Sequence, residues 1–376
     1  MSNPQIHQLA RTPDGLSRFQ RVPFAIYEGD RNWVAPILSD QRMLLDDRNP
    51  FFQHARMALW VVSRGRRDVG RIAAIVDDVH NRLHPPAAFF GFFECIDDAE
   101  AAAALLDAAA DWARRQGLRR LLGPLSPTLN DEAGLLIEGL DRPPVVMMPY
   151  NPPFYRMLIE GRGFTRIRDL LALVFDVADS PRERLERIER AVLRRNRGLV
   201  LRTLCKSTLD RDLSAVMEVY NAAWERNWGF VPMTADEVRF MARRLRPLLV
   251  PRLAMLVEDE GKPVGFFLAL PDYNQAFKPL RGRLLTPRLL GALPLLMGWK
   301  PTHFVRLIAL GVKPSHRQRG IESLMLAAAL RASLDYGFRQ CEVSWVLEEN
   351  LVTLGLAEFF SARVYKRYRI YECALT

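Results

Sequence analysis

Residues 311–324 read GVKPSHRQRGIESL and join an apolar run, FVRLIALGV (304–312), to a helical apolar pattern that ends at Gly337. Backbone N–H groups at the start of a helix have no intrahelical partner, and together with the helix dipole they attract anions. Arginine side chains add paired hydrogen bonds to phosphate. The stretch predicts a strand, a diphosphate-binding loop and a helix, with a solvated basic turn as the alternative. The predicted loop residues are Arg317, Gln318, Arg319, Gly320 and Ile321.

The elements around this loop occur twice along the chain. MALWVVSRGRRDVGRIAAIVDD (57–78) and LAMLVEDEGKPVGFFLALPD (253–272) each indicate two strands joined by a glycine-containing turn. A third apolar run, a helix ending at glycine and a further strand follow in each half. The pattern predicts an α/β protein of two tandem domains, each a mixed central sheet flanked by helices. The expected bounds are 1–178 and 200–376, with a charged linker helix at 179–199.

The first copy lacks the basic loop. After FFGFFEC the chain continues IDDAEAAAA, with carboxylates at Asp97, Asp98 and Glu100 and no arginine. Negative charge at this helix start repels a diphosphate. We therefore expect residues 1–178 to act as a scaffold or acceptor site without a diphosphate.

The loop and its surrounding elements resemble the GNAT superfamily of acyl-CoA N-acyltransferases, in tandem form. The family pattern V-x-P-x-x-R-x-x-G is matched at Val312, Pro314, Arg317 and Gly320. The resemblance implies that the loop amides hold the CoA pyrophosphate and that pantetheine lies beside the strand carrying Leu310 and Val312. It also implies that Asn350 contacts CoA and that acyl-CoA is the co-substrate.

Two positions depart from the family pattern. Glu322 stands where the family usually has glycine or alanine, and a carboxylate there repels a diphosphate unless it turns away or pairs with a nearby arginine. Ala357 stands where the family usually has a tyrosine acid. Catalysis must therefore use another acid or none.

A carboxylate or a water chain is needed because an amine must lose a proton to attack a thioester. Asp272 and Asn274 form a polar cluster at the end of a predicted central strand, and they are our first choice of catalytic residues together with Glu348. Glu342 and Glu349 are further candidate bases around the next strand. The alternative for Asp272 and Asn274 is an ordinary turn that ends a strand.

An insertion at residues 276–300 reads AFKPLRGRLLTPRLLGALPLLMGWK and contains no acidic residue. Leucines and Trp299 supply apolar surface, and five basic residues supply charge. The pattern predicts a segment that lies on an anionic membrane surface, or a lid over a hydrocarbon chain. A hairpin packed on the protein itself is the alternative. A lipidic acyl donor, a lipidic amine acceptor or both are therefore expected.

Further stretches resemble a group of bacterial proteins that includes ceramide synthases: RNWGFVPMT (226–234), PDYNQA (271–276), FFGFFE (89–94), NDEAGLL (130–136) and VYKRYRIYE (364–372). This resemblance implies acyl transfer from acyl-CoA to the amine of a sphingoid base. The alternatives are a non-catalytic CoA or lipid sensor and an acetyltransferase for a small amine.

Composition limits the partners and the location. The chain has 376 residues and a net charge of +10, which favours anionic partners. The cations are spread along the chain without a nucleic-acid motif, so no nucleic-acid partner is expected. No signal peptide or membrane-spanning run is evident, and the four cysteines are scattered. These features predict a cytoplasmic protein, peripheral on the inner face of the cytoplasmic membrane.

One histidine pair has the spacing of metal ligands on a helix. His80 and His84 stand four residues apart, but Asn81 and Pro85-Pro86 indicate a loop, and no third ligand is near. No metal site is therefore expected.

Overall fold

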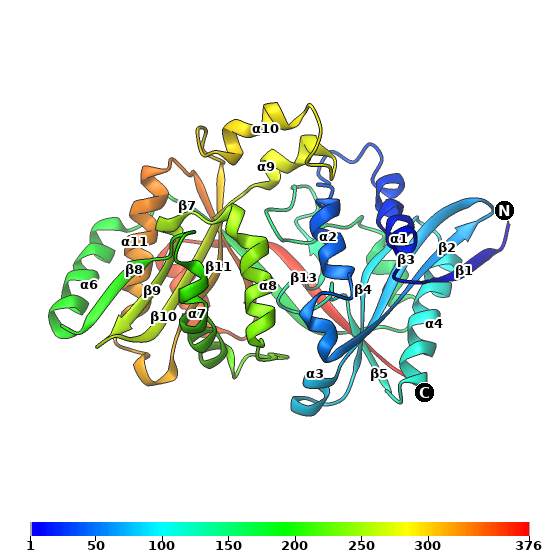
Figure 1. Cartoon of the computed structure of the whole chain (residues 1–376), viewed down its shortest axis with the longest axis horizontal. Helices are drawn as coiled ribbons and strands as arrows, with labels where there is room; N and C mark the ends of the chain where they lie inside the picture. Colours follow the sequence, from blue (N-terminus) through cyan, green and yellow to red (C-terminus); the bar gives the residue numbers. More distant parts are fainter. Residues whose placement is uncertain (1, 376) are drawn as a thin grey trace. The chain divides into compact units, whose positions relative to one another are not determined.

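The computed structural model describes residues 2–375, which divide into two compact units (Figure 1). Unit 1 consists of the chain up to Leu171, together with Leu280–Thr286 and the C-terminal residues from Lys366. Unit 2 consists of Ala172–Pro279 and Pro287–Tyr365. Each unit combines a mixed sheet with flanking helices, so the predicted α/β fold class is confirmed. Unit 1 takes two segments from the part of the sequence assigned above to the second domain.

Unit 1 has the strand order β1-β2-β3-β4-β5-β13, and β6 also pairs with β13. Only β4 and β5 pair in parallel; the other pairs are antiparallel. The strands are β1 (Pro4–Leu9), β2 (Ala55–Arg64), β3 (Arg67–Asp77), β4 (Ala88–Cys95), β5 (Arg120–Gly123), β6 (Leu135–Glu138) and β13 (Arg363–Ala374, of which residues from Lys366 belong to unit 1).

The helices of unit 1 include the long amphipathic helix predicted in the first copy. This helix, α4 (Ala99–Arg115), buries Leu105 and Ala109 in a core that also contains Val62 and Ile72 of the sheet. It ends before Gly117, whose φ of 78° suits glycine. The other helices are α1 (Pro13–Ile26), α2 (Leu38–Leu45), α3 (Asp78–Leu83) and α5 (Tyr155–Glu160).

The short helix α3 (Asp78–Leu83) corrects the loop that Asn81 and Pro85-Pro86 predicted. The side chain of Asp77 accepts hydrogen bonds from the N–H groups of Val79 and His80, at 2.8 and 3.2 Å. Such a cap starts a helix because it satisfies N–H groups that have no intrahelical partner. The prediction gave more weight to the prolines that follow the helix than to the aspartate that precedes it.

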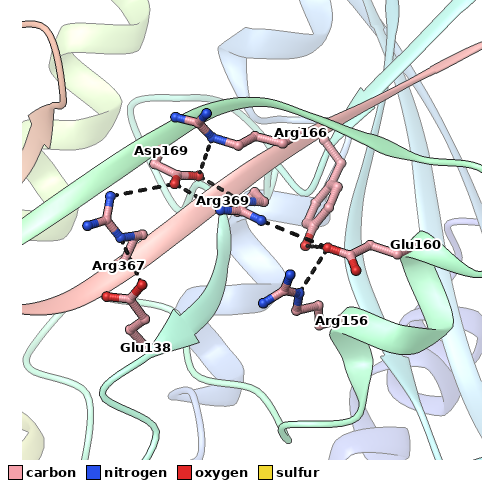
Figure 2. A network of polar contacts seen from close by, with 8 residues as sticks. Glu138, Arg156, Glu160, Arg166, Asp169, Arg367 and Arg369 are labelled. Carbon is pink, nitrogen blue, oxygen red and sulfur yellow. Dashed lines mark hydrogen bonds and ion pairs between the residues drawn. The ribbon is translucent and has the colours of Figure 1, made fainter.

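An ionic network joins three strands of unit 1 (Figure 2). Asp169 is buried, and Arg369 donates two hydrogen bonds to its carboxylate at 2.8 and 3.0 Å. Arg166 and Arg367 lie 3.3 and 3.6 Å from the same carboxylate (Figure 2). Burial opposes ionisation of Asp169, but the hydrogen bonds and charge of Arg369 outweigh it and lower the pKa of Asp169. The network holds the end of the chain in register.

Unit 2 has the strand order β7-β12-β11-β10-β9-β8. Strands β8 to β11 pair antiparallel in succession, whereas β11 and β12 are parallel. The strands are β7 (Thr165–Asp176, of which residues from Ala172 belong to unit 2), β8 (Leu199–Thr203), β9 (Ala254–Asp259), β10 (Lys262–Pro271), β11 (Phe304–Val312) and β12 (Gln340–Leu347). The predicted hairpin is confirmed: Glu260 and Gly261 both have positive φ, as a two-residue hairpin turn requires.

Helices cover both faces of the sheet in unit 2. A Cβ on Gly265 would meet Ile321 and Met325 of α11 (Ile321–Asp335), whereas one on Gly311 would meet Trp224 of α7 (Leu209–Trp224). The charged helix α6 (Arg182–Arg195) lies beside α11 (Figure 1), and Arg331 of α11 is paired with Glu189. The remaining helices are α8 (Ala235–Leu245), α9 (Asn274–Phe277), α10 (Leu289–Leu296) and α12 (Leu351–Phe359).

Candidate functional site

The two parallel strands of unit 2 separate at the middle of their length. β11 and β12 pair from Phe304 with Gln340 to Leu307 with Val343. β11 continues to Val312 and β12 to Leu347, but within residues 2–375 no further pairing joins them. The pairing of β10 with β11 also shifts here and leaves Ile308 as an extra residue. We call this point the fork. Beyond it, one edge of β11 is open to a ligand that can pair with a strand.

The loop between β11 and α11 presents unpaired backbone donors. Gln318 and Gly320 have φ of 63° and 79°, and α11 begins at Ile321 without a side-chain cap. Within the described part of the chain, no acceptor is found for the N–H groups of residues 317–323. A Cβ on Gly320 would lie 2.5 Å from Val192 Cγ2 of α6, so both backbone conformation and space require glycine. This cluster of N–H groups at a helix N-terminus can bind an anion.

The arginine side chains of the loop hold the loop in place. Arg319 donates to Asn196 and Asp259, both at 2.9 Å, and Arg317 donates to the carbonyl oxygen of Ala223 at 2.9 Å. In this arrangement the predicted anion site consists of backbone N–H groups, and the two arginines fix their geometry.

Glu322 lies in the first turn of α11 and is half-buried. In the described residues it forms no ion pair with Arg317, Arg319 or another cation. Its charge therefore stays beside the anion site, where it opposes a diphosphate.

The other predicted CoA-binding residues lie around the fork. Leu310 is half-buried and Val312 is buried, both on the part of β11 beyond the fork. Asn350 caps α12, and its side chain accepts the N–H of Thr353 at 3.1 Å. Because β11 and β12 are parallel, the helices α11 and α12 that follow them begin at the same edge of the sheet.

A narrow apolar pocket, partly open to solvent, lies between the sheet and the helices α11 and α12. It is bounded by strands β7, β10, β11 and β12, and its lining is apolar except for Ser333, Thr353 and the thiol of Cys341. Burial raises the pKa of Cys341 to about 12, so this thiol stays protonated near neutral pH.

A buried carboxylate lies at the fork on the opposite face of the sheet. Glu342 is fully buried; it accepts a hydrogen bond from Ser344 Oγ at 2.5 Å and another from the hydroxyl of Tyr365. Arg306 Nε donates to Ser344 Oγ at 3.0 Å and lies 4.0 Å from the Glu342 carboxylate. We call these four residues the fork cluster. It places an acid or base and a hydroxyl where the strands begin to separate.

Sequence reasoning named Glu342 but missed its partners. The pattern QCEVSWVL (340–347) alternates, so Glu342 and Ser344 share one face of β12 while Cys341 and Val343 share the other. Two polar residues on one face of a central strand are a usable signal. The contribution of Tyr365 has no such signal, because it comes from a strand 23 positions later.

The predicted catalytic residues Asp272 and Asn274 lie at the end of β10. Asp272 is buried; its carboxylate accepts the N–H of Asn274 at 3.2 Å and the side-chain amide of Gln275 at 3.2 Å, both in the first turn of α9. Glu348 lies in the turn after β12 and is half-buried.

The insertion at 276–300 exposes much of its apolar surface. The exposed apolar residues are Leu284, Leu285, Leu290, Met297 and Trp299, and the basic residues Lys278, Arg281, Arg283, Arg288 and Lys300 are also exposed. Ala276, Leu280 and Ala292 are buried. In unit 1, the carbonyl oxygen of Gly282 accepts the N–H of Leu38 at 2.9 Å. No helix formed by residues 2–375 is long and apolar enough to cross a membrane.

Unit 1 has the same elements, but its own side chains occupy the corresponding positions. At the start of α4 the carboxylate of Asp98 accepts the N–H of Ala101 at 3.0 Å and is paired with Arg64, which lowers the pKa of Asp98. Pairing of β4 with β5 covers only two residues of each strand. Beyond it, Ser126 Oγ accepts the N–H of Phe92 at 2.8 Å. The gap in unit 1 is therefore filled by the chain itself.

Metal ligands do not gather in either unit. Across residues 2–375, no group of three or more His, Cys, Asp or Glu side chains is arranged to hold a metal ion. The ring of His80 packs on Phe89 and on His84. Burial lowers the pKa of His80, as expected for a packed neutral imidazole.

Comparison with known proteins identifies relatives over the whole chain. Residues 213–360 match the Acetyltransferase (GNAT) family. The chain is 34% identical over 379 residues to a protein named bacterial ceramide synthase from Caulobacter vibrioides (strain NA1000 / CB15N), covering 97% of this chain and 96% of the relative. It is 31% identical over 369 residues to Protein YghO from Escherichia coli (strain K12), covering 95% of this chain and 92% of the relative.

A solved structure has the same fold at low sequence identity. A tandem GNAT protein from the clavulanic acid biosynthesis pathway, determined without acetyl-CoA, aligns with a TM-score of 0.60 and 16% identity over 100% of this chain and 99% of that one. The match supports the predicted tandem arrangement.

Proposed function

Because the chain belongs to the GNAT family of acetyltransferases and is thus an acyl-CoA-dependent acyltransferase, we propose that it transfers a long acyl group to the amine of a sphingoid base. The name of the Caulobacter relative supports this acceptor. The proposal places the reaction in unit 2, at the fork.

The observation that carries the proposal is the divergence of β11 and β12 beyond Leu307 and Val343, next to the uncapped start of α11. The N–H groups around Gly320 bind the diphosphate of CoA. The open edge of β11, which includes Leu310 and Val312, pairs with the amides of pantetheine. The thioester then lies at the fork, where Ile308 interrupts the regular pairing.

The fork cluster supplies the acid–base chemistry in this proposal. The amine nitrogen attacks the thioester carbonyl carbon, and Glu342 accepts the proton that the amine loses. The C–S bond then breaks, and the CoA sulfur takes up a proton. In this proposal the proton comes from the hydroxyl of Tyr365, which is hydrogen-bonded to Glu342. Backbone N–H groups on the open edge of β11 stabilise the oxyanion between the two steps.

Asp272 and Glu348 remain the alternative bases, with Asn274 as a polar partner. Each carboxylate oxygen of Asp272 already accepts a hydrogen bond from the first turn of α9. Glu342 is the stronger candidate because it combines complete burial with a position at the fork.

The insertion supports a membrane-bound acceptor. Its exposed leucines and Trp299 insert into the headgroup region, and its exposed cations pair with anionic lipids at about 1 kcal/mol each. We therefore place the protein on the inner face of the cytoplasmic membrane, where a sphingoid base is available. An acetyltransferase for a small soluble amine needs no such surface.

The test is a transfer assay with purified protein. Palmitoyl-CoA and acetyl-CoA are each offered with sphinganine or with a short soluble amine, and N-acylated products are measured by mass spectrometry. We expect product from palmitoyl-CoA with sphinganine above all other pairs. Product from acetyl-CoA with the short amine alone would support the small-amine enzyme. No product with any pair, despite measurable CoA binding, would support a sensor, for which Glu322 beside the anion site is the motivating feature.

A further inference from the structure

The apolar pocket under α11 and α12 suits the acyl end of the acyl-CoA donor. We propose that it holds the acyl chain of acyl-CoA and that its closed end sets the chain length accepted. The inference rests on the proposed function, because it needs acyl-CoA bound at the fork. It adds a binding site that the family motif does not contain, since none of the loop residues 317–321 line the pocket.

The burial of the lining changes from one end of the pocket to the other. Leu326 and Thr353 are half-buried and lie in the first halves of α11 and α12, and the half-buried Leu310 lies near the end of β11. Phe175, Val177 and Phe360 are buried at the opposite end. The first group forms the mouth and the second group the floor. The mouth therefore lies at the edge of the sheet where the anion-binding loop begins α11.

The length of the pocket follows from its wall residues. On α11 the lining runs from Leu326 to Ser333, which spans roughly 10 Å at the helical rise per residue. On α12 it runs from Thr353 to Phe360, a similar distance. The pocket is therefore longer than an acetyl group. Its cavity volume of about 70 Å³ makes it a narrow channel, so an occupant must be slender.

The pocket suits a hydrocarbon and does not suit the pantetheine arm. Pantetheine carries two amides that need partners, and an unpaired buried amide is costly. Around Val305 and Cys341 the strands β11 and β12 are paired with one another, so that backbone groups are not open at this level. Open backbone is found only beyond the fork. A donor bound at the fork thus has a polar slot on one side and an apolar pocket on the other.

In this proposal the acyl chain and the catalytic base Glu342 lie on opposite faces of the sheet. Val305, Leu307 and Val343 line the pocket, whereas Arg306 and Glu342 at intervening positions belong to the fork cluster. Successive residues of a strand point to opposite faces. An acyl chain in the pocket therefore leaves the opposite face of the thioester to the amine and to Glu342.

Small side chains keep the pocket open. Ala269, Ala329 and Ala357 all line it and are buried. Ala357 is the position where the sequence departs from the tyrosine usual in the family, and a tyrosine ring there would occupy part of the pocket. The departure that removes the expected acid thus also provides space for the chain.

Binding of CoA, acetyl-CoA, octanoyl-CoA and palmitoyl-CoA to the full chain, measured by calorimetry below the micelle concentration, tests the proposal. Each buried methylene contributes roughly a fourfold gain in affinity. We expect octanoyl-CoA to bind at least about 100-fold more tightly than acetyl-CoA. If CoA itself does not bind, the proposed function fails. If CoA binds but chain length has no effect on affinity, the pocket proposal fails while the proposed function stands.

Substitutions in the pocket test whether the acyl chain of the donor lies there. Ala329→Phe fills the middle of the pocket, and it should remove most of the gain of palmitoyl-CoA over CoA while leaving CoA affinity within threefold. Ala328→Phe is the matched control, because Ala328 is the neighbouring residue of α11 and does not line the pocket. Equal loss in both variants, or no loss in Ala329→Phe, would overturn the proposal.

A substitution at the mouth of the pocket gives a second test that is less affected by misfolding. Thr353→Phe narrows the half-buried mouth, so its effect on the fold should be smaller than that of a core substitution. It should lower the affinity for palmitoyl-CoA at least tenfold without changing the affinity for CoA. An unchanged preference for palmitoyl-CoA in a folded Thr353→Phe protein would contradict a chain that enters between α11 and α12.

Discussion

Replacing Glu342 by glutamine tests whether the fork cluster carries the acid–base chemistry. The substitution keeps the size of the side chain but removes the base. A positioned general base contributes about 10²–10⁴-fold to rate, or roughly 3–5 kcal/mol of transition-state stabilisation. We therefore expect kcat to fall by about 10²–10⁴-fold, with the affinity for acyl-CoA unchanged, because the diphosphate and the chain bind elsewhere.

The same substitution has a cost in stability that the structure allows us to judge. Glu342 accepts from Ser344 and Tyr365, and Arg306, whose side chain is only 3% exposed, has Glu342 as a nearby counter-ion. Removing one member of a buried ion pair costs about 3–5 kcal/mol, and the 4.0 Å separation places this pair at the low end. Thermal unfolding must therefore be followed, and rates compared only where the variant is folded.

Tyr365→Phe and Asp272→Asn complete the experiment. Tyr365→Phe removes one hydrogen bond to Glu342, worth about 1.5–3 kcal/mol, and should lower kcat less than Glu342→Gln. Asp272→Asn should weaken the hydrogen bonds to the first turn of α9 and change kcat less than either. A folded Glu342→Gln protein with kcat within threefold of the original, or a larger loss in Asp272→Asn, would refute the assignment of the base to Glu342.

Three further predictions concern stability, CoA affinity and membrane binding. Asp169→Asn should destabilise the protein by about 3 kcal/mol at pH 7, because Arg369 loses its buried partner. Since the folded pKa of Asp169 is lowered, this stability difference is complete above pH of about 4 and shrinks as the pH falls below it. Denaturant unfolding of both proteins at several pH values measures the difference. Glu322→Gln should tighten CoA binding about two- to tenfold in calorimetry, with the gain reduced at high salt; weaker binding would show that Glu322 faces away from the diphosphate. Replacing Leu285 and Trp299, 97% and 72% exposed, by serine should reduce sedimentation with vesicles of anionic lipid while leaving thermal stability unchanged, and equal sedimentation of both proteins would remove the membrane contact.

The repeat and the loop could be predicted because both depend on local chemistry. Alternating or helical apolar patterns, glycine at Gly117 and Gly337, and the basic turn before Gly320 are short-range signals, and the structure has strands, helices and the uncapped start of α11 where they indicate. The acyltransferase family followed from the same loop. Short-range signals also misled once: Asp77 starts a helix where prolines indicated a loop.

Positions within the site could be predicted only in part. Asp272 was selected because it ends a predicted strand, and Glu342 and Glu348 were named as candidates around the next strand, with less weight on Glu342. Which carboxylate lies at the fork depends on the register between β11 and β12, and register is set by pairing across the sheet. The sequence contains no signal for the partnership of Glu342 with Tyr365.

The sequence by itself determined two sets of strands and helices, an anion-binding turn in only one of them, and a basic apolar segment, because each is specified by residues close together in the chain. Tertiary structure alone decided where β11 and β12 diverge, beyond Leu307, that an apolar pocket lies under α11 and α12, and that residues from Lys366 complete unit 1. These features depend on which strand pairs with which and on how much space the packed side chains leave. Both are sums over contacts between residues far apart in the chain, which a local pattern does not specify.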